Sequence, residues 1–174
     1  EVRLWATAWL ADAVALAAVF VAGFLAPPPW TGRLWLTIYV ACKTAYAFLL
    51  VAGARNHLQP GTELRLKRRH IVAVLAVWSV AIGFFSPRIA HSQMAQSLMV
   101  GGIVTYGAVW VLRHPRRPRS RWLGWALLVE GLVFLHYVPF LAPLVWNGGR
   151  SSPHLRVSSF IDAGAELLLA LAIL

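Results

Sequence analysis

Acidic residues are scarce in this sequence, which has 6 Asp and Glu against 16 Lys and Arg and a formal net charge of +10. Cysteine is nearly absent as well: a single one, Cys42, rules out an internal disulfide framework and a metal cluster held by several thiolates. Charged residues make up only 13% of the chain, and 59% of it is hydrophobic. Soluble domains are about 25% charged and about 45–50% apolar, so the composition excludes an ordinary soluble domain.

Long hydrophobic runs recur along the whole chain, and no segment between them is long enough to fold as a separate domain outside a membrane. A helix of about 20 apolar residues spans the hydrocarbon core of a bilayer. The sequence therefore predicts one all-α domain, residues 1–174, built as a bundle of six transmembrane helices. The expected spans are residues 4–25, 34–54, 70–85, 94–112, 122–144 and 155–174.

Proline and glycine mark the ends of these spans and their packing faces. Three consecutive prolines in segment 26–30 are expected to end the first span, and Pro139 and Pro143 to interrupt the fifth. Glycines of the fourth span, at 101, 102 and 107, are expected to permit close approach of a neighbouring helix.

Basic residues are concentrated in segments 55–69 and 113–121, each of which holds five Arg or Lys. Short loops rich in Arg and Lys face the cytoplasm, so both ends of a six-span chain are expected on the cytoplasmic side. We expect these arginines to set the orientation and to contact anionic lipid head groups rather than nucleic acid. The final residues, 167–174, are wholly apolar, so we also expect the natural chain to continue into the cytoplasm.

Four of the six acidic residues fall inside expected spans, where charge is costly and by default marks function. Asp12 in the first span and Lys43 in the second lie at similar depths on neighbouring antiparallel helices. The sequence predicts an intramembrane ion pair between them. Two interpretations stay open: a pair that fixes how the two helices dock, and a pair that a ligand or a proton breaks.

A second group of polar side chains is expected between the last two spans. Asp162 and Glu166 are four residues apart and share one helix face, and like charges that close in an apolar setting favour protonation of at least one of them. His136 and Glu130 lie at similar depths on the fifth span. These four residues are our candidates for a ligand- or proton-sensing site; the alternative is a satisfied polar network that locks the two spans together.

Three histidines, His91, His136 and His154, are expected toward the outer side, where imidazole nitrogens can bind a metal ion or haem. Their spacing matches no known motif, so they are weak candidates, and we otherwise expect no cofactor. The sequence contains neither HExxH nor GxSxG, and we identify no catalytic residue.

Several segments taken together resemble a family. They are RLWATAWL, a second span that ends in AGARNHLQPG, WLGWALLVEGLVFLHYVPFL after an arginine-rich loop, and SSFIDAGAELLLALAIL. This pattern is similar to the multi-pass N-terminal sensor regions of bacterial diguanylate cyclases and sensor histidine kinases. The resemblance implies a sensory input domain in the bacterial inner membrane whose last helix continues into a cytoplasmic signalling enzyme.

The same resemblance implies a homodimer, a fragment that is not itself the enzyme, and in many members one further helix before the first span, which would make seven. Two alternatives from other classes stay open. One is a small proton- or ion-coupled transporter or channel, with the buried charges along its path. The other is a membrane redox protein that binds haem or a quinone.

Overall fold

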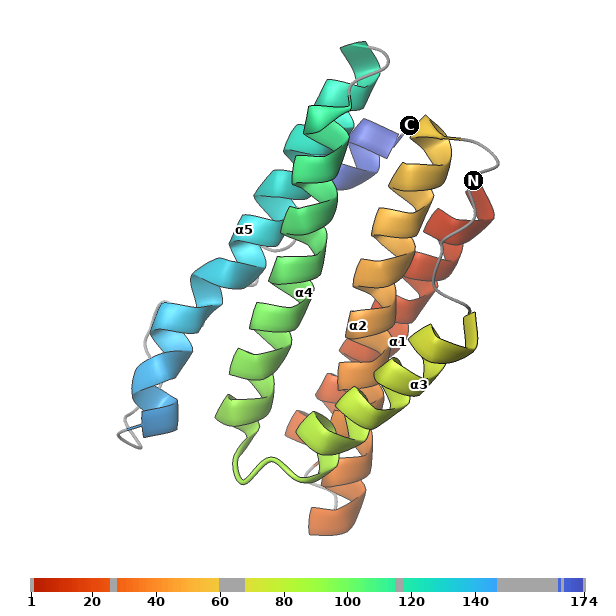
Figure 1. The fold of residues 1–174 in the computed structure, drawn as a ribbon. Helices are drawn as coiled ribbons and strands as arrows, with labels where there is room; N and C mark the ends of the chain where they lie inside the picture. The colour runs from red at the N-terminus through yellow and green to blue at the C-terminus, as the bar shows by residue number, and fades with distance from the viewer. Residues whose placement is uncertain are drawn as a thin grey trace.

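The computed structural model describes residues 2–25, 28–59, 68–114, 118–146, 166 and 168–173. All regular secondary structure in these residues is helical, as the sequence predicts (Figure 1). The elements in chain order are α1 (Val2–Phe24), α2 (Pro29–Leu58), α3 (Arg68–Ser79), the π-helical turn η1 (Val80–Phe84), α4 (Ile89–Arg113) and α5 (Pro118–Trp146).

Four of these helices are long and apolar enough to cross a membrane. Their candidate spans are Arg3–Ala22, Pro29–Leu58, Ile89–Arg113 and Ser120–Trp146. The shortest has 20 residues, about 30 Å of helix, which matches the hydrocarbon core of a bilayer. The prediction of an all-α chain is therefore confirmed for the described residues, and four of its helices have the length and composition of membrane spans.

The count of six spans is not reached in the described residues. The expected third span, 70–85, is a helix, but α3 has only 12 residues and η1 adds 5. Its apolar part, Arg69–Phe84, is shorter than the length that a bilayer-spanning helix needs. The expected sixth span, 155–174, lies outside the described residues except for 166 and 168–173, which are helical.

The described prolines begin helices more often than they interrupt them. Pro28 precedes α2 as its N-cap, and Pro29 occupies the first turn, where a missing backbone N–H costs nothing. The second helix therefore begins five residues earlier than the predicted 34. The predicted interruption of the fifth span is wrong: α5 runs through both Pro139 and Pro143 to Trp146. Membrane helices tolerate internal proline because neighbouring groups satisfy the freed carbonyls.

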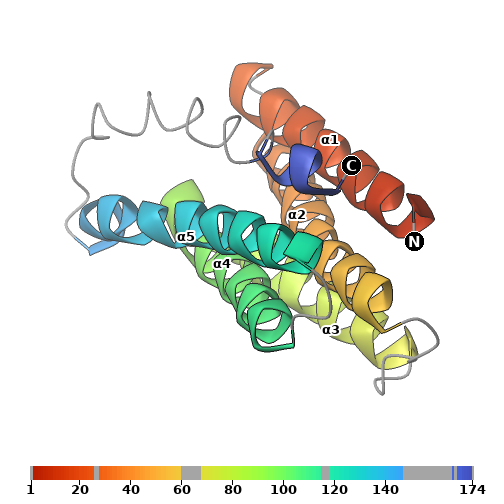
Figure 2. The same ribbon diagram turned by 90° about the horizontal axis from the view of Figure 1, so that it is seen from above.

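The bundle consists of two helix pairs joined through α2. The α1–α2 and α4–α5 pairs pack most extensively, and α2 also contacts α3, η1 and α4 (Figures 1 and 2). Two of the predicted glycines lie in these interfaces. A Cβ at Gly101 would sit 2.7 Å from Leu135 Cγ, and one at Gly107 would sit 2.5 Å from Val51 Cγ2, whereas Gly102 faces open space.

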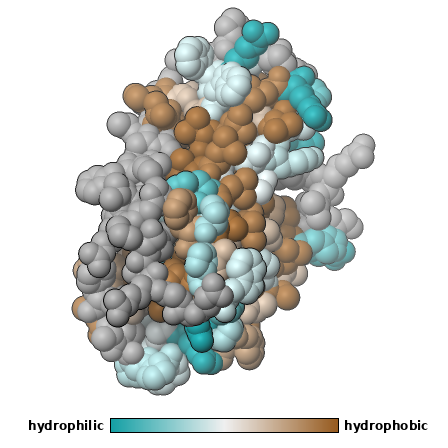
Figure 3. All heavy atoms as spheres, turned by 90° about the vertical axis from the view of Figure 1, so that its left-hand side faces the viewer, coloured by the Kyte–Doolittle hydropathy of each residue, from teal (hydrophilic) through white to brown (hydrophobic). Residues whose placement is uncertain are grey.

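The end of α2 and the α4–α5 turn, which adjoin the two arginine-rich segments, lie at the same end of the bundle, whereas α3, which begins with Arg68 and Arg69, starts nearer its middle. Figure 1 places the N-terminus, the end of α2, the α4–α5 turn and residues 168–173 at this end, and the α1–α2 turn and the η1–α4 connector at the other. Large hydrophobic side chains are exposed between the two ends, among them Leu10, Leu16, Val77 and Leu132. Hydrophobic residues also cover much of the coloured surface in Figure 3, as lipid contact requires.

Candidate functional site

A buried ion pair joins α1 to α2 in the middle of the bundle. Lys43 Nζ donates a hydrogen bond to Asp12 Oδ1, and the two residues are only 6% and 3% exposed. Both lie well inside their helices, far from water at either end. The structure thus brings together the two side chains whose depths predicted a pair, and their mutual attraction offsets part of the cost of burying each charge.

Glu166 supplies a second carboxylate to the same ammonium group. Its Oε1 lies 3.6 Å from Lys43 Nζ, and the Glu166 side chain is 23% exposed. The C-terminal residues are also anchored by apolar contact, because Leu169 is fully buried in the hydrophobic core that contains Trp5 and Leu127. Lys43 therefore links two segments that are far apart in the sequence: the first helix and the last described residues.

Aromatic rings flank the Lys43 ammonium. Its Nζ lies 5.2 Å from the ring centre of Tyr46 and 5.1 Å from that of Phe134, which is on α5. The negative faces of such rings attract a cation, most strongly where water is excluded. Lys43 is thus contacted from α1, from its own helix, from α5 and from the C-terminal residues. We call Asp12, Lys43 and Glu166 the buried charge cluster.

Tyr46 connects this cluster to another buried acid. Its hydroxyl donates a hydrogen bond of 3.1 Å to Glu130 Oε1, and Tyr46 and Glu130 are 0% and 1% exposed. The ring of Trp9 packs against Tyr46 at 5.8 Å. Glu130 was expected near Glu166 on the neighbouring span. Its hydrogen-bond partner Tyr46 is on α2, about one helical turn from Lys43, and the expected proximity of Glu130 to Glu166 stays a prediction.

Of the two remaining sensing candidates, His136 and Asp162, the structure describes His136. His136 is on α5 about 9 Å further along the axis from Glu130, and its ring packs against those of Tyr137 and Phe140 at 5.4 and 5.1 Å. Asp162 lies outside the described residues, so its expected contact with His136 stays a prediction. Among the sensing candidates that the structure describes, an ion pair ties Glu166 to Lys43.

The structure describes two of the three predicted metal or haem ligands. His91 is half-buried in the first turn of α4, His136 is on α5, and His154 lies outside the described residues. Within the part of the chain that the structure describes, no group of three or more His, Cys, Asp or Glu side chains is arranged to hold a metal ion.

A second polar group, which sequence analysis missed, ties α2 to α3 and α4. Gln96 Nε2 donates to Thr44 Oγ1 at 3.0 Å, and Trp78 Nε1 approaches Gln96 Oε1 at 3.5 Å. Gln96 is 2% exposed and Thr44 fully buried. The predictions from the sequence used the charged residues and histidines inside the spans and not the uncharged polar ones. An amide buried in the hydrocarbon also needs hydrogen-bond partners, so Gln96 was a signal that could have been used.

The geometry permits one chemical event in particular. The buried charge cluster has two carboxylates and one ammonium group, so in its fully ionised form it carries one excess negative charge. A proton or a cation that neutralises a carboxylate would weaken the hold of Lys43 on either α1 or the C-terminal residues.

No protein-family model matches the chain, and neither a curated protein nor a solved structure is a significant match to it.

Proposed function

We propose that this chain is a membrane-embedded sensory input domain whose last helix transmits the state of the buried charge cluster to a cytoplasmic signalling enzyme. The supporting observation is the 3.6 Å contact between Lys43 Nζ and Glu166 Oε1. It makes a charge on the last described helix share its partner with Asp12 on the first. A change at this contact would alter the packing of the last described helix, the segment that would lead out of the membrane.

The transmission needs only a modest change in free energy. A stimulus that changes the relative stability of two packings by about 1–3 kcal/mol changes their ratio roughly 5- to 150-fold. In one packing Lys43 holds both carboxylates. In the other, Glu166 is neutral or bound elsewhere, and residues 166–173 shift against α1 and α2. The stimulus is a proton or a small ligand that reaches Glu166, the most exposed member of the cluster.

The wider setting is part of the same proposal. The arginine-rich end of the bundle faces the cytoplasm of a bacterium, following the distribution of positive charge. The spans form six membrane crossings when α3 with η1 and the C-terminal segment are included. The attached enzyme is a diguanylate cyclase or a histidine kinase, and the protein acts as a homodimer.

A distance measurement between two spin labels tests the proposal directly. Labels are placed at Arg113 and Leu171, both exposed at the same end of the bundle, in a variant in which Cys42 is replaced by alanine. The distance distribution is recorded in lipid nanodiscs for the wild-type cluster and for Glu166→Gln, which removes the charge and keeps the shape. We expect Glu166→Gln to shift the distribution.

The matched control is Leu168→Ala, which alters an exposed side chain of the same segment, 54% exposed, and should leave the distances unchanged. Lowering the pH should move the wild-type distribution toward that of Glu166→Gln if the stimulus is a proton. Identical distributions for the wild type and Glu166→Gln would refute a role of the cluster in transmission.

A small proton- or ion-coupled transporter is the second candidate, because a lysine and two carboxylates buried in a bundle are also the groups that line a transport path. Flux measurements in liposomes separate the two functions. An input domain conducts no protons or ions above the background of empty liposomes. A transporter does, and Lys43→Met should abolish that flux.

A further inference from the structure

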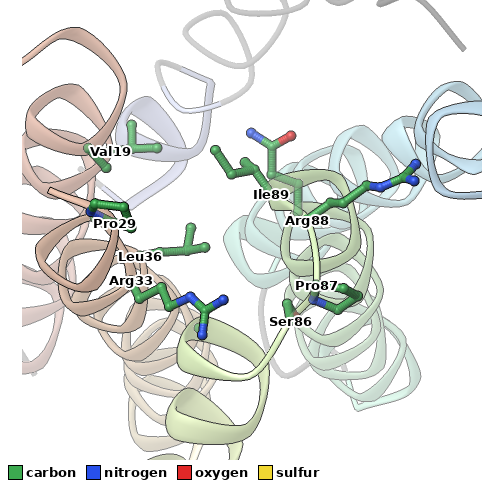
Figure 4. A pocket seen from close by; sticks show the side chains of 12 residues that line it. Val19, Pro29, Arg33, Leu36, Ser86, Pro87, Arg88 and Ile89 are labelled. Atoms are coloured by element: carbon green, nitrogen blue, oxygen red, sulfur yellow. The ribbon is translucent and has the colours of Figure 1, made fainter. Parts of the chain in front are cut away.

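A cavity of about 340 Å³ lies at the end of the bundle opposite the arginine-rich segments, away from the buried charge cluster. Side chains from α1, from the first turns of α2, from the η1–α4 connector and from the start of α4 surround it (Figure 4). Its volume falls in the range of roughly 300–1,000 Å³ that is usual for small-molecule sites. It is therefore large enough for an organic ligand.

Most of the wall is apolar. Val19 and Ala22 of α1, Leu36 of α2 and Ile89 of α4 contribute hydrocarbon surface from three helices. In Figure 4 the side chains of α1 and α2 lie across the opening from those of the connector and of α4. Such a wall suits an alkyl chain or another apolar body, which gains from leaving water or replaces a lipid tail.

The charged residues of the wall, Arg33 and Arg88, are both positive. The guanidinium of Arg33 is directed toward the side of the cavity on which Ser86 lies, and it sits 6.0 Å from the ring centre of Phe84 (Figure 4). Arg88 also lines the cavity, but its guanidinium is directed away from α1 and α2. Among the residues that the structure describes, neither arginine has a carboxylate within ion-pair distance.

Both helices that begin at the cavity add to this positive field. Neither α2 nor α4 has an acidic residue in its first turn or a side chain that caps its N-terminus. The N-terminal end of a helix carries a partial positive charge. None of the acidic residues that the structure describes lines the cavity. The cavity thus combines an apolar wall with a cation at its rim that no described carboxylate neutralises.

We infer that this cavity binds an amphiphilic anion, with its carboxylate or phosphate head on the Arg33 guanidinium and its alkyl chain between Val19, Leu36 and Ile89. The guanidinium donates two parallel hydrogen bonds to such a head group, and this geometry is stronger and more selective than a single contact. The inference does not depend on the proposed signalling function, because it concerns another site and is tested by binding alone. The head group is that of a free fatty-acid anion or of an anionic membrane lipid.

Binding of decanoate to the purified chain in nanodiscs of phosphatidylcholine tests the inference. Radiolabelled decanoate is titrated against nanodiscs with and without the protein, so that partition into the lipid is subtracted. We expect saturable binding by the wild type. Arg33→Ala should weaken it about tenfold or more, as loss of a hydrogen bond to a charged group does. Decanol, which has the same chain without the charge, should bind weakly and equally to both proteins.

Three further variants separate the roles of the wall and the rim. Arg88→Ala should reduce decanoate binding far less than Arg33→Ala, since its guanidinium is directed away. Ala22→Phe, which fills the cavity with an apolar ring, should abolish binding of decanoate, while the helical content by circular dichroism shows whether the variant still folds. Arg33→Lys keeps the charge and should restore part of the affinity.

A competition experiment identifies the source of the anion: decanoate binding is measured again in nanodiscs that contain the anionic lipid phosphatidylglycerol. Loss of decanoate binding in these nanodiscs assigns the site to the anionic lipid, and unchanged binding assigns it to the free anion; both outcomes support an anionic head on Arg33. Equal binding of decanoate and decanol, or a wild-type affinity in Arg33→Ala, would overturn the inference and leave the cavity as an ordinary gap filled by lipid tails.

Discussion

Replacing Lys43 with methionine is the sharpest test of how the charge cluster holds the bundle together. Methionine keeps a long unbranched side chain but removes the ammonium group, so Asp12 and Glu166 are left as carboxylates without their shared partner. Removing one member of a buried ion pair costs about 3–5 kcal/mol, because the remaining charge stays buried. With Lys43 6% and Asp12 3% exposed, we expect a loss of about 4 kcal/mol in the free energy of unfolding.

The other members of the cluster should give smaller losses, in an order that the geometry fixes. Asp12→Asn leaves Lys43 with Glu166 at 3.6 Å, so we expect a loss of about 2–3 kcal/mol. Glu166→Gln should cost roughly 1 kcal/mol, because its side chain is 23% exposed and water screens the charge. The double variant Asp12→Asn, Lys43→Met should cost less than the sum of its parts by about 2 kcal/mol, since the two residues are in direct contact.

Equilibrium unfolding in mixed micelles of increasing denaturing detergent, followed by circular dichroism, measures these free energies. Leu16→Ala is the control, because its side chain is 52% exposed on the lipid-facing surface and should cost little. A Lys43→Met protein as stable as the wild type would refute the reasoning. Strict additivity of the two single substitutions would do so as well, because it would mean that the pair contributes nothing as a pair.

Three other predictions follow from the packing and the orientation. Gly131→Val should destabilise the α4–α5 pair by about 1–3 kcal/mol, because a Cβ there lies 2.4 Å from a threonine oxygen, whereas Gly102→Val faces open space and should be nearly neutral in the same unfolding assay. Tyr46→Phe should cost about 1–3 kcal/mol in that assay, because it deprives a buried carboxylate oxygen of its hydrogen bond. In intact cells, a membrane-impermeant thiol reagent should label Trp30→Cys and leave Arg113→Cys unlabelled, each in a background without the native cysteine, and the reverse pattern would show the opposite orientation.

The helices could be predicted from the sequence because each leaves a long run of apolar residues. The end at which each connector lies could be predicted because arginine-rich segments alternate with connectors that hold a single arginine. The third span could not be judged in the same way. Its run of apolar residues suggested a span, but the helix begins in a basic stretch and ends in a π-helical turn, and its apolar part is shorter than those of the four candidate spans. Nor did the rule that proline breaks helices anticipate α5, which continues through Pro139 and Pro143.

The sequence predicts how deep each charged side chain of the candidate site lies in the membrane, but not which helix that side chain faces. Counting residues from the ends of spans placed Asp12 and Lys43 at one level, and adjacent antiparallel helices had to meet. The same counting put Glu166 near the middle of its span, where we expected it to face the fifth span, and it did not anticipate the contact with Lys43. That contact depends on how the C-terminal residues pack, and burial of Leu169 in the common core turns Glu166 toward Lys43.

The turn η1 has a consequence for insertions and deletions. Its backbone bonds span one residue more than those of an α-helix. Trp78, just before the turn, reaches Gln96, and Gly83, inside it, rests on the backbone of Thr37 because it has no side chain. Deleting Ala81 should convert η1 into an α-helical turn and leave Trp78 and Gly83 close to their present partners. The same deletion inside a regular helix would rotate everything beyond it by about 100°, so this segment should tolerate the loss of a residue better than α4 or α5 does.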